Sequence, residues 1–296
     1  MKKSKFSVLH AVLLVLLAAF TLSLFFLLYW TLVTALKNPM MFNRKAYMEE
    51  NLGWLLGFKD LSFENVSYAW QNFTVTVRTT GAEVGIVGMF GNSVLYSIGS
   101  AFFATIIPCI VAYLCARYRY RFGSVVYTVV LIAMALPIVG SLPSEITMVK
   151  NLGLMDSIFG LWLLKCNFLG LYFLVFYATF KGIAFEYTEA ASIDGASEFR
   201  IMVTIIFPLA IGTIFTVFIL KFIEFWNDYQ IPMIYWNSHP VAAYGMFEFN
   251  RSTVGMNGRV PVKMAGMLIM TLPILVVYGI FNGKLTANVT VGGVKG

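Results

Sequence analysis

The chain has 296 residues, of which 21 are basic and 14 are acidic, so charged residues make up only 12% of the sequence. An ordinary soluble domain carries roughly 25% charged residues. The hydrophobic share of 59%, with 27 Phe, is more than one core of this size could hide from water. The composition therefore argues against a soluble globule, excludes disordered, collagenous, coiled-coil and disulfide-scaffold classes, and indicates a membrane protein.

The net charge of +7 does not indicate nucleic-acid binding, because the basic residues lie in small groups at the ends of apolar runs. That distribution is typical of membrane proteins. Cys109, Cys115 and Cys166 lie inside apolar segments without metal-ligand spacing, so we expect inert buried thiols.

Six apolar runs are each long enough to cross about 30 Å of hydrocarbon at about 1.5 Å per residue. The first follows three lysines, but it is longer than the apolar core of a signal peptide and lacks a clear cleavage site, so we expect a retained span. The predicted spans are Phe6–Leu36, Asn92–Ala116, Ser124–Met148, Ser157–Phe180, Pro208–Pro232 and Pro261–Gly283. The sequence thus predicts an all-α, polytopic membrane protein with six transmembrane helices.

The spans divide the chain into residues 1–36, 37–91 and 92–296, and the last part contains an inner loop, 181–207, and a C-terminal tail, 285–296. Segment 37–91 has balanced charge and several aromatic residues, such as Trp54 and Trp70. We expect it to form a small folded cap outside the membrane. A loose linker is the alternative, although the composition is not rich in Gly and Ser.

The Lys and Arg residues of the tails and short loops set the orientation. With the N-terminus inside, ten are cytoplasmic and four are outside. The inner set is Lys2, Lys3, Lys5, Arg117, Arg119, Arg121, Lys181, Arg200, Lys284 and Lys295, and the outer set is Lys150, Arg251, Arg259 and Lys263. We therefore predict that both termini are cytoplasmic.

No pattern in the chain predicts an enzyme. The only histidines are His10 and His239, which cannot supply a zinc site or support a Ser/His/Asp triad. Segment 279–284 reads G-x-x-x-G-K, one residue short of a phosphate-binding loop and without its Ser or Thr. We expect no cofactor in this chain, so any ATP and Mg²⁺ would be bound by another subunit.

The inner loop carries a short helix followed by a sharp turn. Ala190 and Ala191 are good helix formers, Glu189 lies near the start, where the helix dipole favours an acid, and Gly195 permits a left-handed turn. Small residues would let another protein approach this helix closely. A solvated amphipathic connector is the other interpretation of these features.

The spacing of this loop resembles a known family signature. Glu189-Ala190-Ala191, then Gly195, Ile205 and Phe207-Pro208 are similar to the signature loop of the permease subunits of ATP-binding-cassette importers, in which Leu is usual at the position of Phe207. The resemblance implies a type I importer permease fold. It also implies that the helix docks in a cleft of the ATPase. The positions assigned to this coupling are Glu189, Ala190, Ala191, Asp194, Gly195 and Pro208.

Weaker similarities extend over about residues 63–296 and point to the carbohydrate importers of the maltose-transporter type. The residues concerned are Asn92-Ser93, Ala112-Tyr113 with Arg117, Pro137 and Pro143, Leu152-Gly153-Leu154, Trp226-Asn227-Asp228 with Pro232, and Gly292-Gly293-Val294-Lys295-Gly296. The resemblance implies a second homologous permease subunit, two cytoplasmic ATPase subunits, an extracytoplasmic solute-binding protein, a sugar substrate and a bacterial cytoplasmic membrane, with no nucleic acid. The extra residues 288–291 depart from the family tail.

Lys221, Glu224 and Asp228 are spaced by three and four residues, so they fall on one face of the predicted fifth span. Charges at this depth face the interior of the bundle or an aqueous path, here with Lys165 as a further partner. One interpretation is a polar wall for a hydroxylated substrate, and the other is an ion-pair lock between helices. The candidate path residues of this span are Lys221, Glu224, Trp226, Asn227, Asp228 and Tyr229.

Pro137 and Pro143 fall within the predicted third span, where a proline removes a backbone hydrogen bond. They are candidates for a constriction or hinge of the path, and an ordinary kink is the alternative. Two other function classes stay open from the residues alone. One is a secondary transporter with Lys165, Glu224 and Asp228 as an ion or proton relay. The other is a membrane scaffold that transports nothing.

Overall fold

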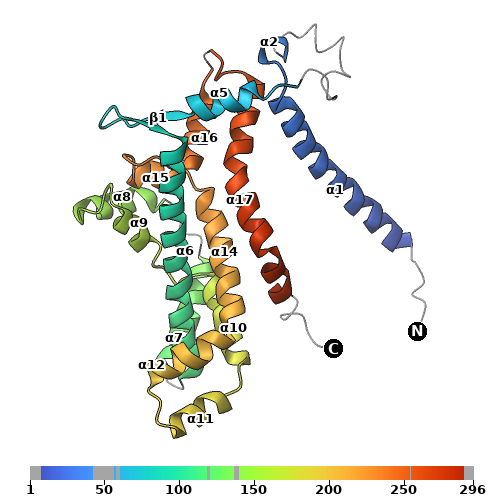
Figure 1. Cartoon of the computed structure of the whole chain (residues 1–296). Coiled ribbons are helices and arrows are strands. Elements are labelled where there is room, and N and C mark those ends of the chain that lie inside the picture. Colours follow the sequence, from blue (N-terminus) through green and yellow to red (C-terminus); the bar gives the residue numbers. More distant parts are fainter. Residues whose placement is uncertain are drawn as a thin grey trace. The chain divides into compact units, whose positions relative to one another are not determined.

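The computed structural model describes residues 8–42, 57, 61–118, 121–136, 140–253 and 255–289. These residues form two compact units, each described here by itself (Figure 1). Unit 1 consists of residues 1–74 and 246–272, and unit 2 consists of residues 75–245 and 273–296.

Unit 1 contains the predicted first span. Helix α1 (Val8–Ala35) is apolar all round, as expected of a helix surrounded by lipid or by other membrane helices. Helices α2 (Pro39–Phe42) and α5 (Glu64–Asn72) follow. The buried Asn65 side chain donates hydrogen bonds to the carbonyl oxygens of Ala35 (2.8 Å) and Lys37 (2.7 Å), which fixes α5 at the end of α1.

The described part of segment 37–91 contains helices and strands, whereas Trp54 lies outside the described residues. That this segment is a cap outside the membrane stays a prediction. Besides α2 and α5 it contains a two-stranded sheet of β1 (Thr74–Thr76) and β2 (Glu83–Gly85). Gly81 has a φ of +70° in the turn, which favours glycine. The strict all-α prediction is therefore wrong for this short hairpin, because the sequence does not alternate over enough residues to reveal it.

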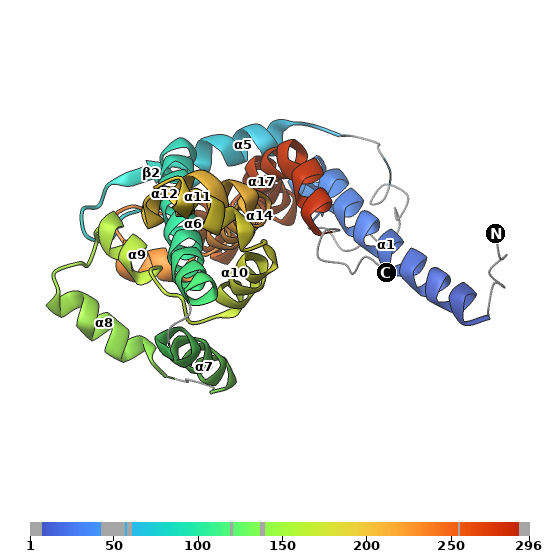
Figure 2. The ribbon, with the colours of Figure 1, turned by 90° about the horizontal axis from the view of Figure 1, so that it is seen from below.

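Helix α6 (Ile86–Arg117) is the central element of unit 2 and packs along α14 (Ile211–Trp226) and α10 (Leu171–Gly182) (Figures 1 and 2). It begins six residues before the predicted start. Its buried face is rich in small side chains, which let neighbouring helices approach closely. These are Ser93, Ser97, Ser100, Ala101, Ala104 and Ala112.

The predicted third span is not one helix. Helix α7 (Arg121–Ala135) ends before a break, and α8 (Leu142–Asn151) begins after it. Pro143 occupies the first turn of α8, where its missing N–H would have no helical partner in any case. The predicted span is interrupted just before Pro143, and the assignment of Pro143 to a hinge or constriction of the path stays a prediction. Pro137 lies outside the described residues.

The predicted fourth and fifth spans are also divided. Helix α9 (Ile158–Leu164) is separated from α10 by a non-helical segment in which Asn167 Oδ1 accepts the N–H of Leu169 (2.8 Å). Helix α14 ends at Trp226, and the short helix α15 (Gln230–Tyr235) follows. Polar side chains that bond to nearby backbone compete with helix in both places, and average hydropathy does not register this.

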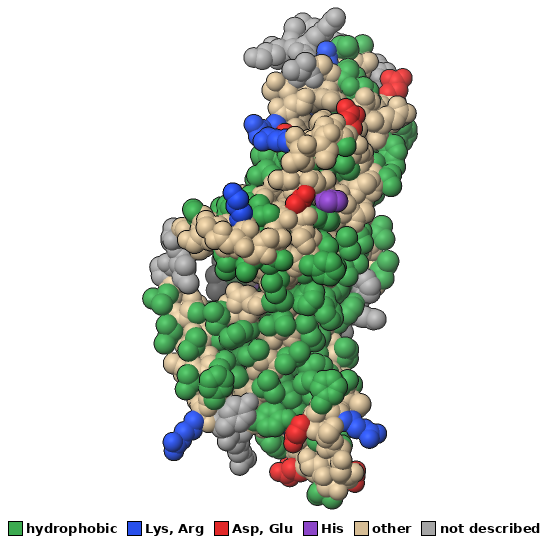
Figure 3. All heavy atoms as spheres, turned by 90° about the vertical axis from the view of Figure 1, so that its left-hand side faces the viewer, with side chains coloured by type: hydrophobic (Ala, Val, Ile, Leu, Met, Phe, Trp, Pro, Cys, Tyr) green, Lys and Arg blue, Asp and Glu red, His purple; other side chains and the backbone are tan. Residues whose placement is uncertain are grey.

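The last helices are α16 (Ala242–Arg251) and α17 (Val260–Val289), which extends into the predicted tail 285–296. Three helices of the described chain are long and apolar enough to cross a membrane alone, and a fourth span exists if one bent pair counts as a single span. The three are His10–Ala35, Ile86–Arg117 and Val260–Ile280. On the face in Figure 3, hydrophobic side chains cover much of the middle, and charged ones lie both in the upper part and at the lower end near α11 and α12.

Candidate functional site

The loop of residues 181–207, which we call the coupling loop after the role predicted for it, contains α11 (Glu186–Ile193), so the predicted short helix is confirmed. Ala191 is the single buried residue of α11 and joins a hydrophobic cluster that includes Tyr113 and Phe180. Glu189 and Ala190 are exposed, and Ile193 is 85% exposed. The helix thus rests on the bundle through one small side chain and presents its other faces outward.

Gly195 ends α11 in a left-handed conformation with φ of +78°, as its predicted turn requires. The N–H of Ala196 bonds to the carbonyl of Ala191 (3.0 Å), and the N–H of Gly195 bonds to that of Ser192 (3.1 Å). This pair of bonds is a Schellman motif, in which glycine is favoured because it has no Cβ. Asp194 is the C-cap, and its N–H bonds to the carbonyl of Ala190.

After the turn the chain forms α12 (Glu198–Ile201), a π-helical segment (Met202–Ile206) and α13 (Phe207–Leu209). The helical stretch Glu198–Leu209 meets α14 at 76°. Pro208 lies within this stretch and has no N–H to donate, and proline is a common cause of helix distortion. Pro208 therefore lies just before the bend between the coupling loop and the bundle.

The aromatic ring of Phe207, where the signature usually has Leu, packs inside the bundle. It stacks on Phe180 at 5.9 Å between ring centres and meets the edge of Tyr113 at 6.0 Å. The larger side chain thus joins the same cluster as Ala191. The coupling loop is held to the bundle by this cluster.

Two residues at the end of α6 hold the loop in ways that the sequence did not reveal. The guanidinium of Arg117 donates to the carbonyl oxygens of Ile183 (3.0 Å) and Ala184 (3.4 Å). Tyr118 donates its O–H to the Glu198 carboxylate at 2.7 Å. Burial, followed by this hydrogen bond, raises the pKa of Tyr118, so the phenol stays protonated and remains a donor.

A second group of charged side chains lies deeper in unit 2, and we call Tyr96, Lys165, Lys221, Glu224 and Asp228 the polar cluster. Lys221 pairs with Glu224 at 2.8 Å. Lys165 lies 4.0 Å from Asp228, which also accepts the O–H of Tyr96 at 2.8 Å. The sequence predicted these charges to be partnered, and this is confirmed.

Asp228 differs from the other members because it lies beyond the end of α14. Its Oδ1 accepts the N–H groups of Gln230 (3.1 Å) and Ile231 (3.2 Å), and so satisfies the first turn of α15. Its Oδ2 faces Tyr96 and Lys165. This carboxylate therefore joins α6, the end of α9 and the start of α15, which favours the lock interpretation for Asp228.

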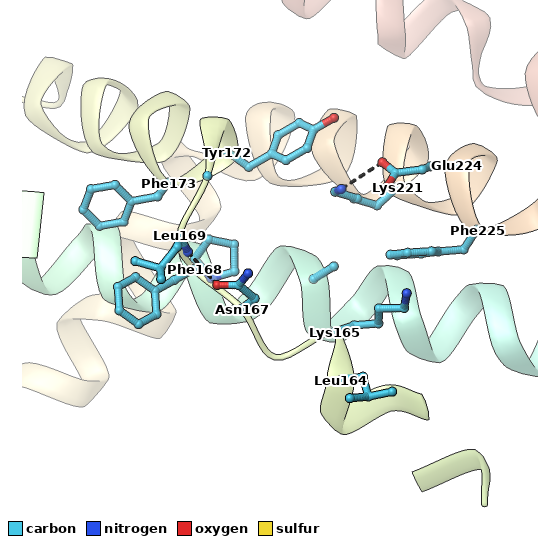
Figure 4. Close-up of a pocket in the computed structure, with 13 residues that line it drawn as sticks. Leu164, Lys165, Asn167, Phe168, Leu169, Tyr172, Phe173, Lys221, Glu224 and Phe225 are labelled. Carbon is cyan, nitrogen blue, oxygen red and sulfur yellow. Dashed lines mark hydrogen bonds and ion pairs between the residues drawn. The ribbon is translucent and has the colours of Figure 1, made fainter. Parts of the chain in front are cut away.

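Lys165, Lys221 and Glu224 line a cavity of about 240 Å³, together with side chains of α6, α10 and the segment after α9 (Figure 4). The ammonium of Lys165 lies 4.8 Å from the ring centre of Phe225, and that of Lys221 lies 4.9 Å from that of Tyr172. The Glu224 side chain is 53% exposed. The cavity thus offers both donors and an acceptor to a hydroxyl-rich ligand.

The structure places the remaining candidate path residues elsewhere. Trp226 is only 5% exposed and packs between Phe90 and Phe222, which makes it a core side chain and not a stacking surface for a sugar. Asn227 donates to the carbonyl of Ile223 in its own helix. Neither these residues nor Tyr229 and Pro143 line the cavity.

Several side chains of the cavity and its surroundings were missed at the sequence level. Tyr96 is separated from Asp228 by 132 positions, and Glu145 accepts the O–H of Tyr235 across 90 positions. Asn167, from the segment that interrupts the predicted fourth span, and Tyr172, from the start of α10, line the cavity. Within the described chain, no three His, Cys, Asp or Glu side chains are placed to hold a metal ion.

Two of the weaker family-like motifs have clear structural roles. Asn92 donates to the carbonyl of Pro240 (3.0 Å), and Ser93 accepts the N–H of Ala242 (2.7 Å), so this pair fixes the start of α16 to α6. Gly153, with φ of +66°, ends α8 by a second Schellman motif.

Comparison with known proteins identifies relatives along most of the chain. Residues 104–291 match the family model described as "Binding-protein-dependent transport system inner membrane component". The chain is 28% identical over 226 residues to a probable starch degradation products transport system permease protein of Thermoanaerobacterium thermosulfurigenes, covering 74% of this chain and 79% of the relative. It is 26% identical to the diacetylchitobiose uptake system permease protein of Streptomyces coelicolor, covering 78% of this chain and 73% of the relative.

A third relative is the melibiose/raffinose/stachyose import permease protein of Bacillus subtilis, 26% identical, with 80% of this chain and 82% of the relative covered. Among solved structures, a bacterial ABC transporter involved in the import of the acidic polysaccharide alginate is similar, with a TM-score of 0.73, 18% identity and coverage of 96% of this chain and 98% of that chain. At that identity the likeness concerns the fold. These matches favour the importer interpretation over an ion-coupled transporter.

Proposed function

The chain belongs to the family of inner membrane components of binding-protein-dependent transport systems, and from this premise we propose that it is one of two homologous permease subunits in an importer of an oligosaccharide or a sugar derivative. The named sugars of three relatives support the substrate class: starch degradation products, diacetylchitobiose, and melibiose, raffinose or stachyose. In this proposal the chain forms half of the translocation path. Two ATPase subunits hydrolyse ATP, and a solute-binding protein delivers the sugar from outside.

The observation that carries the coupling proposal is the shape of α11 and its turn. The helix has one buried residue, Ala191, and an outward surface that includes Glu189 and the 85% exposed Ile193. Burial of such an exposed isoleucine side chain against another protein would lower the free energy of the complex. In the proposal, closure of the ATPases moves α11, and the cluster around Ala191 passes the movement to α6 and α10.

The cavity of the polar cluster is the proposed part of the path in this subunit. Lys165, Lys221 and Glu224 lie on its wall, so a sugar passing there would exchange hydrogen bonds with water for hydrogen bonds with these groups. In this proposal Asp228 does not contact the sugar but holds α6, α9 and α15 together next to the cavity.

We further propose that the chain crosses a bacterial cytoplasmic membrane six times, with both termini inside. The excess of basic residues on one side of the predicted spans supports this orientation. In this topology α7 with α8 and α9 with α10 are interrupted spans, and irregular backbone at membrane depth is tolerated where it lines a cavity. The segment between α9 and α10 lines the cavity of the polar cluster.

The coupling proposal is tested with Glu189→Ala in the assembled transporter reconstituted in vesicles. We expect normal assembly and a clear loss of sugar-stimulated ATP hydrolysis, because the Glu189 side chain is exposed on α11. Glu186→Ala, one turn earlier on the same helix, is the matched control. Normal stimulation in Glu189→Ala would contradict the docking role.

The orientation is tested with single cysteines in a background that lacks the three native ones. An impermeant thiol reagent added to intact cells should label positions 51 and 256 and leave position 192 unlabelled. Labelling of position 192 from outside, or protection of both outer positions, would overturn the six-span arrangement.

A further inference from the structure

A second cavity of unit 2 lies beside the coupling loop and is separate from the polar cluster. Its volume is about 560 Å³, and it is bounded by the end of α6, the start of α7 and the end of α10. Arg121 and Lys181 contribute the charged part of its wall, and Tyr118 and Ser124 contribute hydroxyl groups. The rings of Tyr177 and Phe185 form an aromatic part.

Among the described residues, the charged side chains that line this cavity are all basic. No Asp or Glu is among its lining residues in the part of the chain that the structure describes, and neither Arg121 nor Lys181 forms an ion pair there. Glu198, which contacts the lining residue Tyr118, accepts its O–H at 2.7 Å. The ammonium of Lys181 lies over the ring of Tyr177, 4.8 Å from its centre, and its side chain is exposed.

These groups match the chemistry of a phosphate ligand. A guanidinium presents parallel N–H donors to phosphate oxygens, and an ammonium adds a point charge. The hydroxyl of Ser124 can donate to a remaining phosphate oxygen, whereas the O–H of Tyr118 is already donated to Glu198. The positive-inside bias accounts for cations at this end of the helices, but a shared cavity with no acid on its wall is a separate observation.

We propose that this cavity binds the phosphate group of an anionic ligand. The surroundings favour the head group of an anionic phospholipid as the source. Arg121 lies at the start of the apolar helix α7 and Lys181 at the end of the apolar helix α10, where lipid head groups meet a membrane protein.

The site has a direct connection to the coupling loop. Phe185, on its wall, lies under the guanidinium of Arg117 at 4.9 Å, and Arg117 holds the carbonyl oxygens of Ile183 and Ala184. A bound phosphate adjacent to these residues stabilises the first residues of the loop that leads into α11. A phosphate bound in this cavity therefore makes the coupling of ATP hydrolysis to sugar transport more efficient. This effect on coupling rests on the proposed function, whereas the binding of phosphate does not.

Binding is measured on the assembled transporter in nanodiscs of phosphatidylcholine with increasing phosphatidylglycerol, with retained lipid counted by native mass spectrometry. Arg121→Gln and Lys181→Gln should each weaken retention of phosphatidylglycerol about fivefold, and the double variant about 25-fold. Lys181→Arg should retain it. Arg200→Gln removes an exposed charge from α12, outside the cavity, and should leave retention unchanged.

A second arm adds soluble glycerol 3-phosphate to the transporter in phosphatidylcholine alone. Saturable binding of glycerol 3-phosphate that depends on Arg121 and Lys181 would support the phosphate site and would identify its ligand as a free phosphate ester. If the double variant retains phosphatidylglycerol and the transporter does not bind glycerol 3-phosphate, the proposal is overturned. It is also overturned if Arg200→Gln lowers retention of phosphatidylglycerol as much as the cavity variants do. Both measurements detect binding without uptake, so failure of the transport proposal would not affect their outcome.

Discussion

The coupling loop and the polar cluster both contain charged and aromatic residues of unit 2, yet they differ in whether the charged groups have partners within the chain. In the polar cluster the charges have partners within the chain, and Asp228 alone meets Tyr96, Lys165 and two backbone N–H groups. In the coupling loop Glu186, Glu189 and Asp194 are exposed, beside the exposed Ile193. Glu198 differs from them because it accepts the O–H of Tyr118.

This difference indicates that the charges of the polar cluster are satisfied within the chain, whereas the coupling loop presents its surface to another protein. A charge that is largely shielded from water must be satisfied inside the molecule, so variants of Asp228 should change stability first, whereas variants of Glu224, which is 53% exposed, should not. An exposed apolar side chain on a short helix gains nothing within this chain, so variants of the coupling loop should change coupling while leaving stability nearly intact. Four variants should separate effects on stability from effects on coupling and uptake.

Gly195→Pro should reduce sugar-stimulated ATP hydrolysis at least about tenfold while the complex still assembles. Proline fixes φ near −65°, whereas Gly195 has φ of +78°, and proline also lacks the N–H that bonds to Ser192. ATP hydrolysis in reconstituted vesicles is the measurement. Gly182→Ala is the control, because Gly182 lies at the other end of the loop, has no positive φ and has open space around its Cα. Normal stimulation in Gly195→Pro would remove the turn from the coupling mechanism.

Asp228→Asn should lower the midpoint of thermal unfolding of the assembled complex by about 5 °C, since hydrogen bonds to a charged group contribute about 1.5 to 3 kcal/mol each. Lys165 would also lose its acidic neighbour at 4.0 Å. Tyr96→Phe should destabilise in the same direction, and the double variant should cost less than the sum because the two residues share one hydrogen bond at 2.8 Å. Additive effects would mean that Tyr96 and Asp228 act independently.

Glu224→Gln should change the free energy of unfolding by no more than about 0.5 kcal/mol, because its pair with Lys221 is between neighbours on one helix and its side chain is 53% exposed. Uptake at limiting sugar should nevertheless fall several-fold if the cavity belongs to the path. Size-exclusion chromatography reports assembly, and uptake of labelled sugar reports transport. Normal uptake at limiting sugar would assign the whole cluster to packing between helices.

Pro143→Ala should have the smallest effect, a loss of less than about 1 kcal/mol with unchanged uptake. Pro143 occupies the first turn of α8, so alanine restores an N–H without relieving a kink, and the cost arises mainly from the greater freedom of the unfolded chain. Thermal unfolding and uptake are measured together. A large loss of uptake would restore Pro143 as a hinge of the path.

The sequence by itself determined the membrane class, the first, second and last long helices and the coupling helix. Each depends on local information: an apolar run of sufficient length, or Ala and Gly at fixed spacing near one another. The turn at Gly195 was predictable because a positive φ is a property of one residue and its neighbours. The ion pair of Lys221 with Glu224 was predictable for the same reason, since both lie on one helix.

Only the tertiary structure decided what Asp228 and Trp226 do. Asp228 meets Tyr96 across 132 positions, and the ring of Trp226 packs against Phe90 rather than facing the cavity. Hydropathy likewise placed Lys165 in a continuous span, whereas it caps α9 beside the break that forms the cavity wall. The physical reason is common to all three: which face of a helix is buried, and where a helix stops for a polar side chain, depend on neighbours that are distant in the sequence.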